Sequence, residues 1–115
     1  TIYDELEFNA TGDIKNCVVF GGEALGISIA KELLDSGKAV KLVEKNLKYC
    51  EMADELLQGK VSIINSKYSS HEIFEEEALD NADIFISATN NDEYNIIKSL
   101  EAKEVGIKKV VAINN

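Results

Sequence analysis

The sequence predicts an α/β fold in which a doubly wound parallel sheet carries helices on both of its faces. Short apolar runs alternate with helical patterns from residue 15 onward, a glycine turn follows the first apolar run, and an acidic residue ends the second run. Strands that read as short continuous apolar runs are typical of parallel sheets covered by helices on both sides. The three observations together predict a single domain with a fold of the class that binds nucleotides.

The first strand is expected over 17–20, where the residues are apolar, and the first helix over 24–34. The apolar residues that predict this helix are Ile27, Ala30 and Leu34, with Ile29 and Leu33 beside them. A second strand is expected over 39–43, and a second helix over 47–57 begins after Asn46, a residue type that caps helices.

The remaining elements are a third strand over 61–64, a short helix over 71–78 capped by Ser70, a fourth strand over 83–88, a long helix over 91–105 and a fifth strand over 109–113. In the long helix we expect Ile96, Ile97 and Leu100 to face inward. Right-handed crossovers then give a Rossmann-like sheet in the order 3-2-1-4-5. Ligands of such folds bind beyond the carboxyl ends of the strands, between strands 1 and 4.

Length and charge limit the classes of function. The chain of 115 residues suits one domain, and its formal net charge is −9, with twelve cations that are all lysine. Nucleic acid needs clustered cations, so it is disfavoured as a partner. No apolar run is long enough to span a bilayer. The two cysteines, Cys17 and Cys50, form no metal or redox motif and predict two reduced thiols.

The predicted domain covers residues 16–115, and residues 1–15 are polar and weakly patterned. We expect this first stretch to be a linker or an arm from a preceding domain. Because the chain begins at Thr1 and stops directly after an apolar strand, we expect it to be a piece of a longer polypeptide.

A near-complete dinucleotide fingerprint, G-x-G-x-x-G, follows the first strand. Gly21 allows the tight turn, Gly26 allows the helix to pack on the sheet, and the open helix N-terminus can accept a pyrophosphate. Glu23 stands where the middle glycine is expected, at the closest approach to that pyrophosphate. The alternative is a nucleotide-free domain in which the glycines only shape the turn.

Two other strand ends carry polar groups. Glu44 is placed to accept hydrogen bonds from ribose hydroxyls and to repel a 2′-phosphate, which favours NAD over NADP; alternatively it pairs with Lys45. Thr89 and Asn90 follow the fourth strand and supply short polar groups, although capping of the next helix by Asn90 or Asn91 explains the same residues.

No catalytic set is predicted. The single histidine, His71, lies among acids and serines and is interpreted as an exposed residue at a helix start. The run Glu75-Glu76-Glu77 is interpreted as a solvated helix face, and no metal cluster, paired-carboxylate site or Ser-His-Asp set can be assembled.

These residues resemble a known family. Residues 18–26, the run Glu44-Lys45-Asn46, the run from Ser87 to Ile96 and the stretch 102–111 are similar to the nucleotide-binding subdomain of TrkA-type potassium-uptake regulators, part of the RCK or KTN group. The resemblance covers residues 16–114 and looks most like the second of two repeats in a duplicated subunit.

The resemblance implies a cytosolic regulatory domain that is not an enzyme and lies at the inner face of the cell membrane through its partner. It implies binding of NAD(H), with ADP or ATP as alternatives, homo-oligomeric rings, and a potassium-translocating membrane subunit that the ligand gates. The cofactor-binding residues that follow are Gly21, Gly22, Glu23, Ala24, Leu25, Gly26, Glu44, Lys45, Asn65, Ser66, Ala88, Thr89 and Asn90.

Two positions depart from the family pattern. Glu23 replaces a glycine, and Asn65-Ser66-Lys67 stands where the family usually has Gly-Asp-Ala, near the adenine. Both departures affect the site and spare the fold, so weak or absent nucleotide binding is predicted for this half. The alternatives are the NAD-binding domain of an oxidoreductase whose catalytic domain is absent from this chain, and a purely structural degenerate domain.

Overall fold

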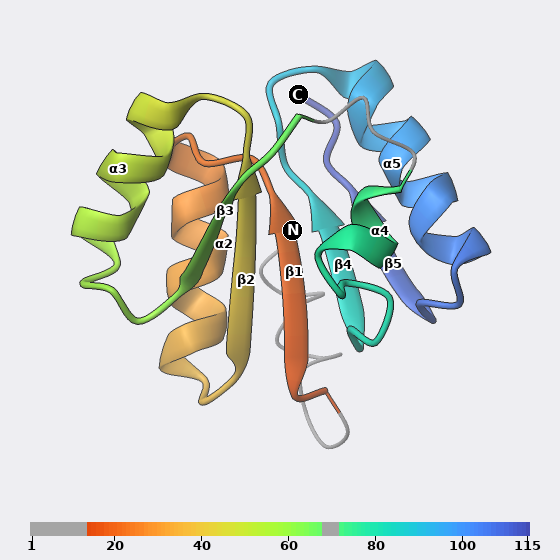
Figure 1. The fold of residues 1–115 in the computed structure, drawn as a ribbon, viewed down its shortest axis with the longest axis horizontal. Coiled ribbons are helices and arrows are strands. Elements are labelled where there is room, and N and C mark those ends of the chain that lie inside the picture. Colours follow the sequence, from red (N-terminus) through yellow and green to blue (C-terminus); the bar gives the residue numbers. More distant parts are fainter. Residues whose placement is uncertain (1–13, 68–71) are drawn as a thin grey trace.

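The computed structural model describes residues 14–67 and 72–115. All five strands of its sheet are parallel and lie in the order β3-β2-β1-β4-β5, which confirms the predicted fold and strand order (Figure 1). The strands are β1 (Asn16–Phe20), β2 (Ala39–Glu44), β3 (Ser62–Asn65), β4 (Ile84–Ser87) and β5 (Lys109–Ala112). The helices are α2 (Ala24–Asp35), α3 (Leu47–Leu56), α4 (Ile73–Glu76) and α5 (Asp92–Glu104).

Each face of the sheet has its own apolar core, because successive side chains of a strand point to opposite faces. Cys17 and Val19 of β1 pack with residues of α2 and α3, whereas Val18 and Phe20 pack with residues of α4 and α5. In the second core, Phe20 lies 5.0 Å from Phe85 between ring centroids, in an edge-on arrangement. The helices therefore sandwich the sheet, and the carboxyl ends of the strands are left for the connecting loops.

The helix between β3 and β4 is shorter than predicted. It spans only Ile73–Glu76, and the chain leaves it through Ala78 at a φ of 54°, a left-handed conformation that stops a helix. Ser70 and His71, the expected cap and the single histidine, lie outside the described residues.

The orientation predicted for α5 is wrong. Ile96, Ile97 and Leu100 are 56%, 45% and 59% exposed, whereas the residues that α5 buries are Asn95, Lys98, Ser99 and Ala102. The apolar periodicity marks one face of the helix, but the hydrogen bonds of Asn95 with Ser87 and with the carbonyl of Ile113 hold the polar face against the sheet. An apolar stripe facing outward needs an explanation that the fold of this chain does not supply.

The two cysteines are free and buried, in agreement with the predicted reduced thiols. Burial raises the pKa of the Cys17 thiol to about 11, so the reactive thiolate is suppressed at neutral pH. Ile14, which precedes the predicted domain boundary, is also buried and packs in the core beside α2 and α3. None of the helices in the described residues has the length and apolar character that crossing a membrane requires.

The carboxylate of Asp83 holds the start of β1. It accepts hydrogen bonds from the backbone N–H groups of Lys15 and Asn16, at 2.8 and 2.9 Å. The bond from Asn16, followed by that from Lys15, lowers the pKa of Asp83 below its ordinary value.

We expect Asp83→Asn to lower the free energy of unfolding by about 1 kcal/mol at pH 7, because a charge-assisted acceptor is lost. Since the folded-state pKa is depressed, this contribution is present above the ordinary carboxyl pKa and is lost as the pH falls through the lowered value. Urea unfolding at pH 7 and in acid measures the difference. Asp80→Asn, on the exposed loop before β4, is the charge-matched control. Equal effects of the two substitutions at pH 7 would refute the role of Asp83.

Candidate functional site

The loops that follow β1, β2 and β4 meet at the carboxyl edge of the sheet. Gly21 donates its backbone N–H to the carbonyl of Val43 at 2.8 Å, and Ala88 donates to the carbonyl of Phe20 at 2.8 Å. The sequence-predicted residues of the glycine turn, Glu44 and Ala88 are thus brought together at the switch point of the sheet, where ligands of this fold class bind.

Gly21 is required by close packing and by its backbone conformation. Its φ is +114°, and a Cβ atom built there would lie 2.6 Å from the carbonyl oxygen of Ala88. Gly26 is required by packing alone, because a Cβ atom would lie 1.7 Å from the carbonyl oxygen of Gly21. The two glycines let the turn fold back onto the first turn of α2 and against the loop after β4.

Glu44 binds the glycine turn directly. Its side chain is 3% exposed, its Oε1 accepts from the N–H of Gly22 at 2.7 Å, and its Oε2 accepts from the N–H of Asn46 at 2.7 Å. A Cβ atom on Gly22 would lie 2.9 Å from the Cγ of Glu44. The buried carboxylate therefore joins the turn after β1 to the start of α3, a structural role that the sequence did not reveal.

The N-terminus of α2 is not capped by the side chain of its own N-cap residue. Glu23 is the N-cap residue, with φ −89° and ψ −174°, and its side chain makes no capping hydrogen bond. By contrast, Asn46 caps α3 and Asn91 caps α5 through their side-chain oxygens. The N–H groups of a first helical turn carry partial positive charge, which favours an anion. Those of α2 lie at the carboxyl edge of β1, β2 and β4, a region named the crevice.

The backbone of Glu23 is extended, a conformation that any residue adopts, so a glutamate at this position does not strain the turn. The side chain is half-buried, while Ala24 is exposed and Leu25 is half-buried beside it. The departure from the fingerprint therefore concerns the space and charge offered to a ligand and leaves the fold intact.

Asn65 and Ser66, at the end of β3, brace the loop after β2. The Nδ2 of Asn65 donates to the carbonyls of Glu44 and Lys45, both at 3.1 Å, and the N–H of Ser66 donates to the carbonyl of Glu44 at 3.2 Å. The amide donors of Asn65 are thus engaged by the protein itself. Lys45 projects from the same loop, with its Nζ 5.6 Å from the centroid of the Tyr94 ring on α5.

Thr89 and Asn90 lie in the loop after β4 but differ in their surroundings. Thr89 is 6% exposed and donates its hydroxyl to the Oδ1 of Asn95 at 2.6 Å, whereas Asn90 is exposed. Of the two predicted capping residues, Asn91 caps α5 by accepting from the N–H of Tyr94 at 3.0 Å. Of Thr89, Asn90 and Asn91, Asn90 is therefore the exposed residue that does not cap α5.

Asn95 is a buried polar residue beside the candidate site that the site prediction missed. It is fully buried in α5 and contacts Thr89 through both its oxygen and its nitrogen. Asparagine has a low helix propensity, because its side chain competes for hydrogen bonds with the backbone. An asparagine within the predicted helix, one turn before Ser99, was therefore the sequence signal of a buried polar contact.

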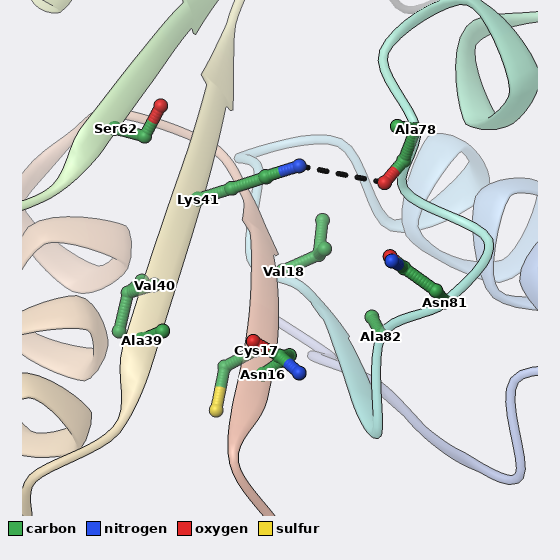
Figure 2. Close-up of a pocket in the computed structure, with 10 residues that line it drawn as sticks. All are labelled: Asn16, Cys17, Val18, Ala39, Val40, Lys41, Ser62, Ala78, Asn81 and Ala82. Carbon is green, nitrogen blue, oxygen red and sulfur yellow. Dashed lines mark hydrogen bonds between the residues drawn. The ribbon is translucent and has the colours of Figure 1, made fainter.

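A groove lies on the sheet near the amino ends of the strands, with a volume of about 210 Å³. Figure 2 shows Val18 on its floor, Asn81 beside it, and Lys41 reaching across toward the carbonyl of Ala78, a contact of 3.4 Å. The groove exists because α4 is only four residues long and leaves part of β2 and β3 uncovered. The groove lies at the starts of β1, β2 and β3, at the opposite ends of these strands from the glycine turn.

Among residues 14–67 and 72–115 there is no group of three or more His, Cys, Asp and Glu side chains placed to hold a metal ion. The groups at the carboxyl edge of β1, β2 and β4 are backbone N–H groups, one buried carboxylate, a lysine and short polar side chains.

The chain is similar in sequence to known proteins of one family. The model of the family described as "TrkA-N domain" matches residues 17–115. The chain is 38% identical over 103 residues to the Trk system potassium uptake protein TrkA of Halomonas elongata, covering 90% of this chain and 22% of that protein. It is 30% identical over 95 residues to the TrkA homolog of Methanothermobacter thermautotrophicus, covering 83% of this chain and 43% of that protein.

The chain therefore spans only about a fifth to two fifths of the length of these two relatives. Among solved structures, a UDP-glucose dehydrogenase from Pyrobaculum islandicum superposes with a TM-score of 0.60 at 21% identity, over 94% of this chain and 24% of that one. Shikimate dehydrogenase from Aquifex aeolicus gives 0.60 at 16% identity, over 97% and 47%. At these identities the likeness concerns the fold alone.

Proposed function

Because this chain belongs to the TrkA-N domain family, we propose that it is a regulatory nucleotide-binding module of a potassium uptake system. NAD(H), or ADP or ATP in its place, lies in this proposal across the carboxyl ends of β1, β2 and β4. The observation that carries the proposal is the N-terminus of α2, which the Glu23 side chain does not cap, near the buried carboxylate of Glu44. A diphosphate suits the first, and ribose hydroxyls suit the second.

The chemistry of the crevice also supports a choice among nucleotides. Each carboxylate oxygen of Glu44 accepts a hydrogen bond from the backbone, and a carboxylate oxygen is able to accept more than one. A 2′-phosphate at this position would face a buried negative charge, and the chain contains no arginine to neutralise it. We therefore propose NAD(H) or an adenine nucleotide and exclude NADP(H).

In this proposal the domain regulates and does not catalyse. Bound nucleotide favours one conformation of an assembly over another, and a potassium-translocating membrane subunit responds at the cytosolic face of the membrane. Such a ligand must bind the two conformations with different affinity. The names of the relatives support the potassium uptake system, and the binding groups at the crevice support the ligand.

A second candidate function is a purely structural domain that has lost its ligand. Three observations favour it: Glu23 in the fingerprint, the two backbone hydrogen bonds already made by Glu44, and the use of the Asn65 amide to brace a loop. Both candidates predict the same fold, so binding must separate them.

Titration calorimetry with NADH, NAD, ADP, ATP and NADPH separates the candidates. The regulatory proposal predicts saturable binding of at least one of the first four ligands and no binding of NADPH. Absence of heat and of any thermal stabilisation with all four would favour the structural domain. Preferential binding of NADPH would contradict the role of Glu44.

We further propose that the outward apolar face of α5 binds a second copy of this chain. Ile96, Ile97 and Leu100 share this face, and the inner face of the helix is already fixed by polar contacts, so the helix cannot rotate to bury them. Large aliphatic side chains gathered on one exposed helix face are typical of interaction surfaces.

We expect Leu100→Asp to weaken self-association by about tenfold or more, because it places a charge in a desolvated contact. Analytical ultracentrifugation of wild type and variant measures the change. Leu56→Asp is the matched control, since Leu56 of α3 is 60% exposed and Leu100 is 59% exposed. A monomeric wild type, or equal effects of the two substitutions, would contradict the assignment of this face.

A further inference from the structure

We propose that Asn95 couples the crevice loop, defined as residues 88–91, to the end of β5, defined as residues 113–115. Asn95 acts as a positioning residue, so that displacement of Thr89 at the crevice changes the contacts of the chain where it leaves the sheet. The coupling is a property of this network; that nucleotide is the signal which displaces Thr89 rests on the proposed function.

The side-chain amide of Asn95 contacts both segments. Its Oδ1 accepts from the Thr89 N–H at 3.0 Å, from the Thr89 hydroxyl at 2.6 Å and from the Ser87 hydroxyl at 3.0 Å. Its Nδ2 donates to the carbonyls of Thr89 at 3.1 Å and Ile113 at 2.9 Å. The orientation of the amide is fixed chemically, because a backbone N–H can meet only the oxygen and carbonyls can meet only the nitrogen.

The side-chain amide of Asn115 also contacts the crevice loop. The Nδ2 of Asn115 donates to the carbonyl of Thr89 at 3.0 Å and to Oδ1 of Asp92 at 2.8 Å, and the backbone N–H of Asn115 donates to the same Asp92 oxygen at 2.8 Å. The carbonyl of Thr89 therefore accepts from both Asn95 and Asn115. Side chains, in addition to the β4–β5 ladder, join the crevice loop to the end of β5.

Burial makes this network resist partial rearrangement. Asn95 is 0% exposed and Thr89 is 6% exposed, so a broken bond leaves a polar group without water to replace its partner. Satisfied buried polar networks of this kind make the segments that they join more rigid. We therefore expect a ligand that displaces Thr89 to alter the contacts of Ile113 and Asn115.

The network lies between the end of β4 and the residues that follow β5. Thr89 follows β4 at the crevice, and Ile113 follows β5, the outer strand of the sheet on that side. The N–H of Ile113 donates to the carbonyl of Ser87 at 2.9 Å, which supplies an amide whose hydrogen exchange reports on the end of β5. A displacement of Thr89 is therefore expected to change the contacts of residues 113–115.

The test compares amide hydrogen exchange in wild type and Thr89→Val. This substitution preserves the size of the side chain and leaves the backbone contacts of Thr89 with Asn95 in place, so the protein is expected to remain folded. It removes the bond of the Thr89 hydroxyl to Asn95, together with the contacts of that hydroxyl with the backbone of Asn91. We expect exchange at Ile113 to accelerate by about fivefold or more, while exchange at Ile107 stays unchanged. The N–H of Ile107 donates to the carbonyl of Ala102 at the other end of α5 and is the internal reference. Unchanged exchange at Ile113 would overturn the coupling whether or not nucleotide binds.

A second arm uses NADH with wild type, Asn95→Ala and Ser99→Ala. Ser99 is buried on the same face of α5, and its hydroxyl has no hydrogen-bond partner among residues 14–67 and 72–115, so its variant controls for truncation on that face. We expect NADH to slow exchange over 113–115 in wild type and Ser99→Ala, and to bind Asn95→Ala without that response. Binding to wild type with no change over 113–115 would overturn the inference alone. Failure of NADH and the adenine nucleotides to bind would overturn the proposed ligand, and Thr89→Val would still decide the coupling.

Discussion

Gly26→Ala is expected to destabilise the domain by about 3 kcal/mol or more, the range of severe overpacking. Gly26 lies in α2, and helix propensity alone predicts the opposite result, a gain of about 1 kcal/mol for alanine. The structure decides between the two effects, because the added Cβ would lie 1.7 Å from the carbonyl oxygen of Gly21. Backbone cannot yield by that amount locally, so α2 must move away from the turn.

Chemical unfolding at equilibrium measures this loss, with Gly37→Ala as the control. Gly37 has a φ of +83°, and no atom of the described residues lies within 4 Å of an added Cβ, so its substitution tests conformational strain without crowding. We expect the control to lose about 1 kcal/mol. A Gly26→Ala variant that is as stable as wild type would show that the turn and helix are not in the close contact described here.

Glu23→Gly is expected to tighten nucleotide binding by about tenfold or more, equivalent to about 1.4 kcal/mol. Two unit charges 4 Å apart repel by about 4 kcal/mol at a surface-like effective dielectric, and rotation of the half-buried side chain toward solvent relieves part of this. Stability should change little, because glycine is an acceptable N-cap and the present glutamate makes no capping hydrogen bond.

Glu23→Gln separates charge from size at this position. If repulsion dominates, the glutamine variant recovers most of the affinity gained by the glycine variant; if crowding dominates, it recovers little. Calorimetry with NADH on the three proteins provides the comparison. Tight binding by wild type, or no gain in either variant, would contradict the view that Glu23 weakens the site.

The fold was predictable because its determinants are local. Apolar runs defined the strands, Asn46 and Asn91 marked helix starts, and Gly21 marked the turn, and the structure agrees within a few residues. The exception is α4, where a pattern over 71–78 yields a helix of only Ile73–Glu76.

The contacts within the site were less predictable, because they join residues far apart in the sequence. The pairing of Glu44 with the Gly22 N–H spans 22 positions, and that of Asn95 with Ile113 spans 18. The inverted orientation of α5 has the same origin. A hydrophobic pattern identifies the apolar face of a helix, but whether that face meets the sheet or a partner depends on polar contacts such as those of Asn95.

The most direct test of the central claim, that the crevice at the carboxyl edge of β1, β2 and β4 binds a nucleotide, is to map NADH on the protein by amide chemical shifts. The account predicts perturbations at Gly22, Ala24, Asn46 and Thr89, because their N–H groups lie at the glycine turn, the start of α2, the Glu44 carboxylate and the loop after β4. Perturbations confined to the groove of Figure 2, near Lys41 and Asn81, or no perturbation at saturating NADH, ADP and ATP, would contradict it.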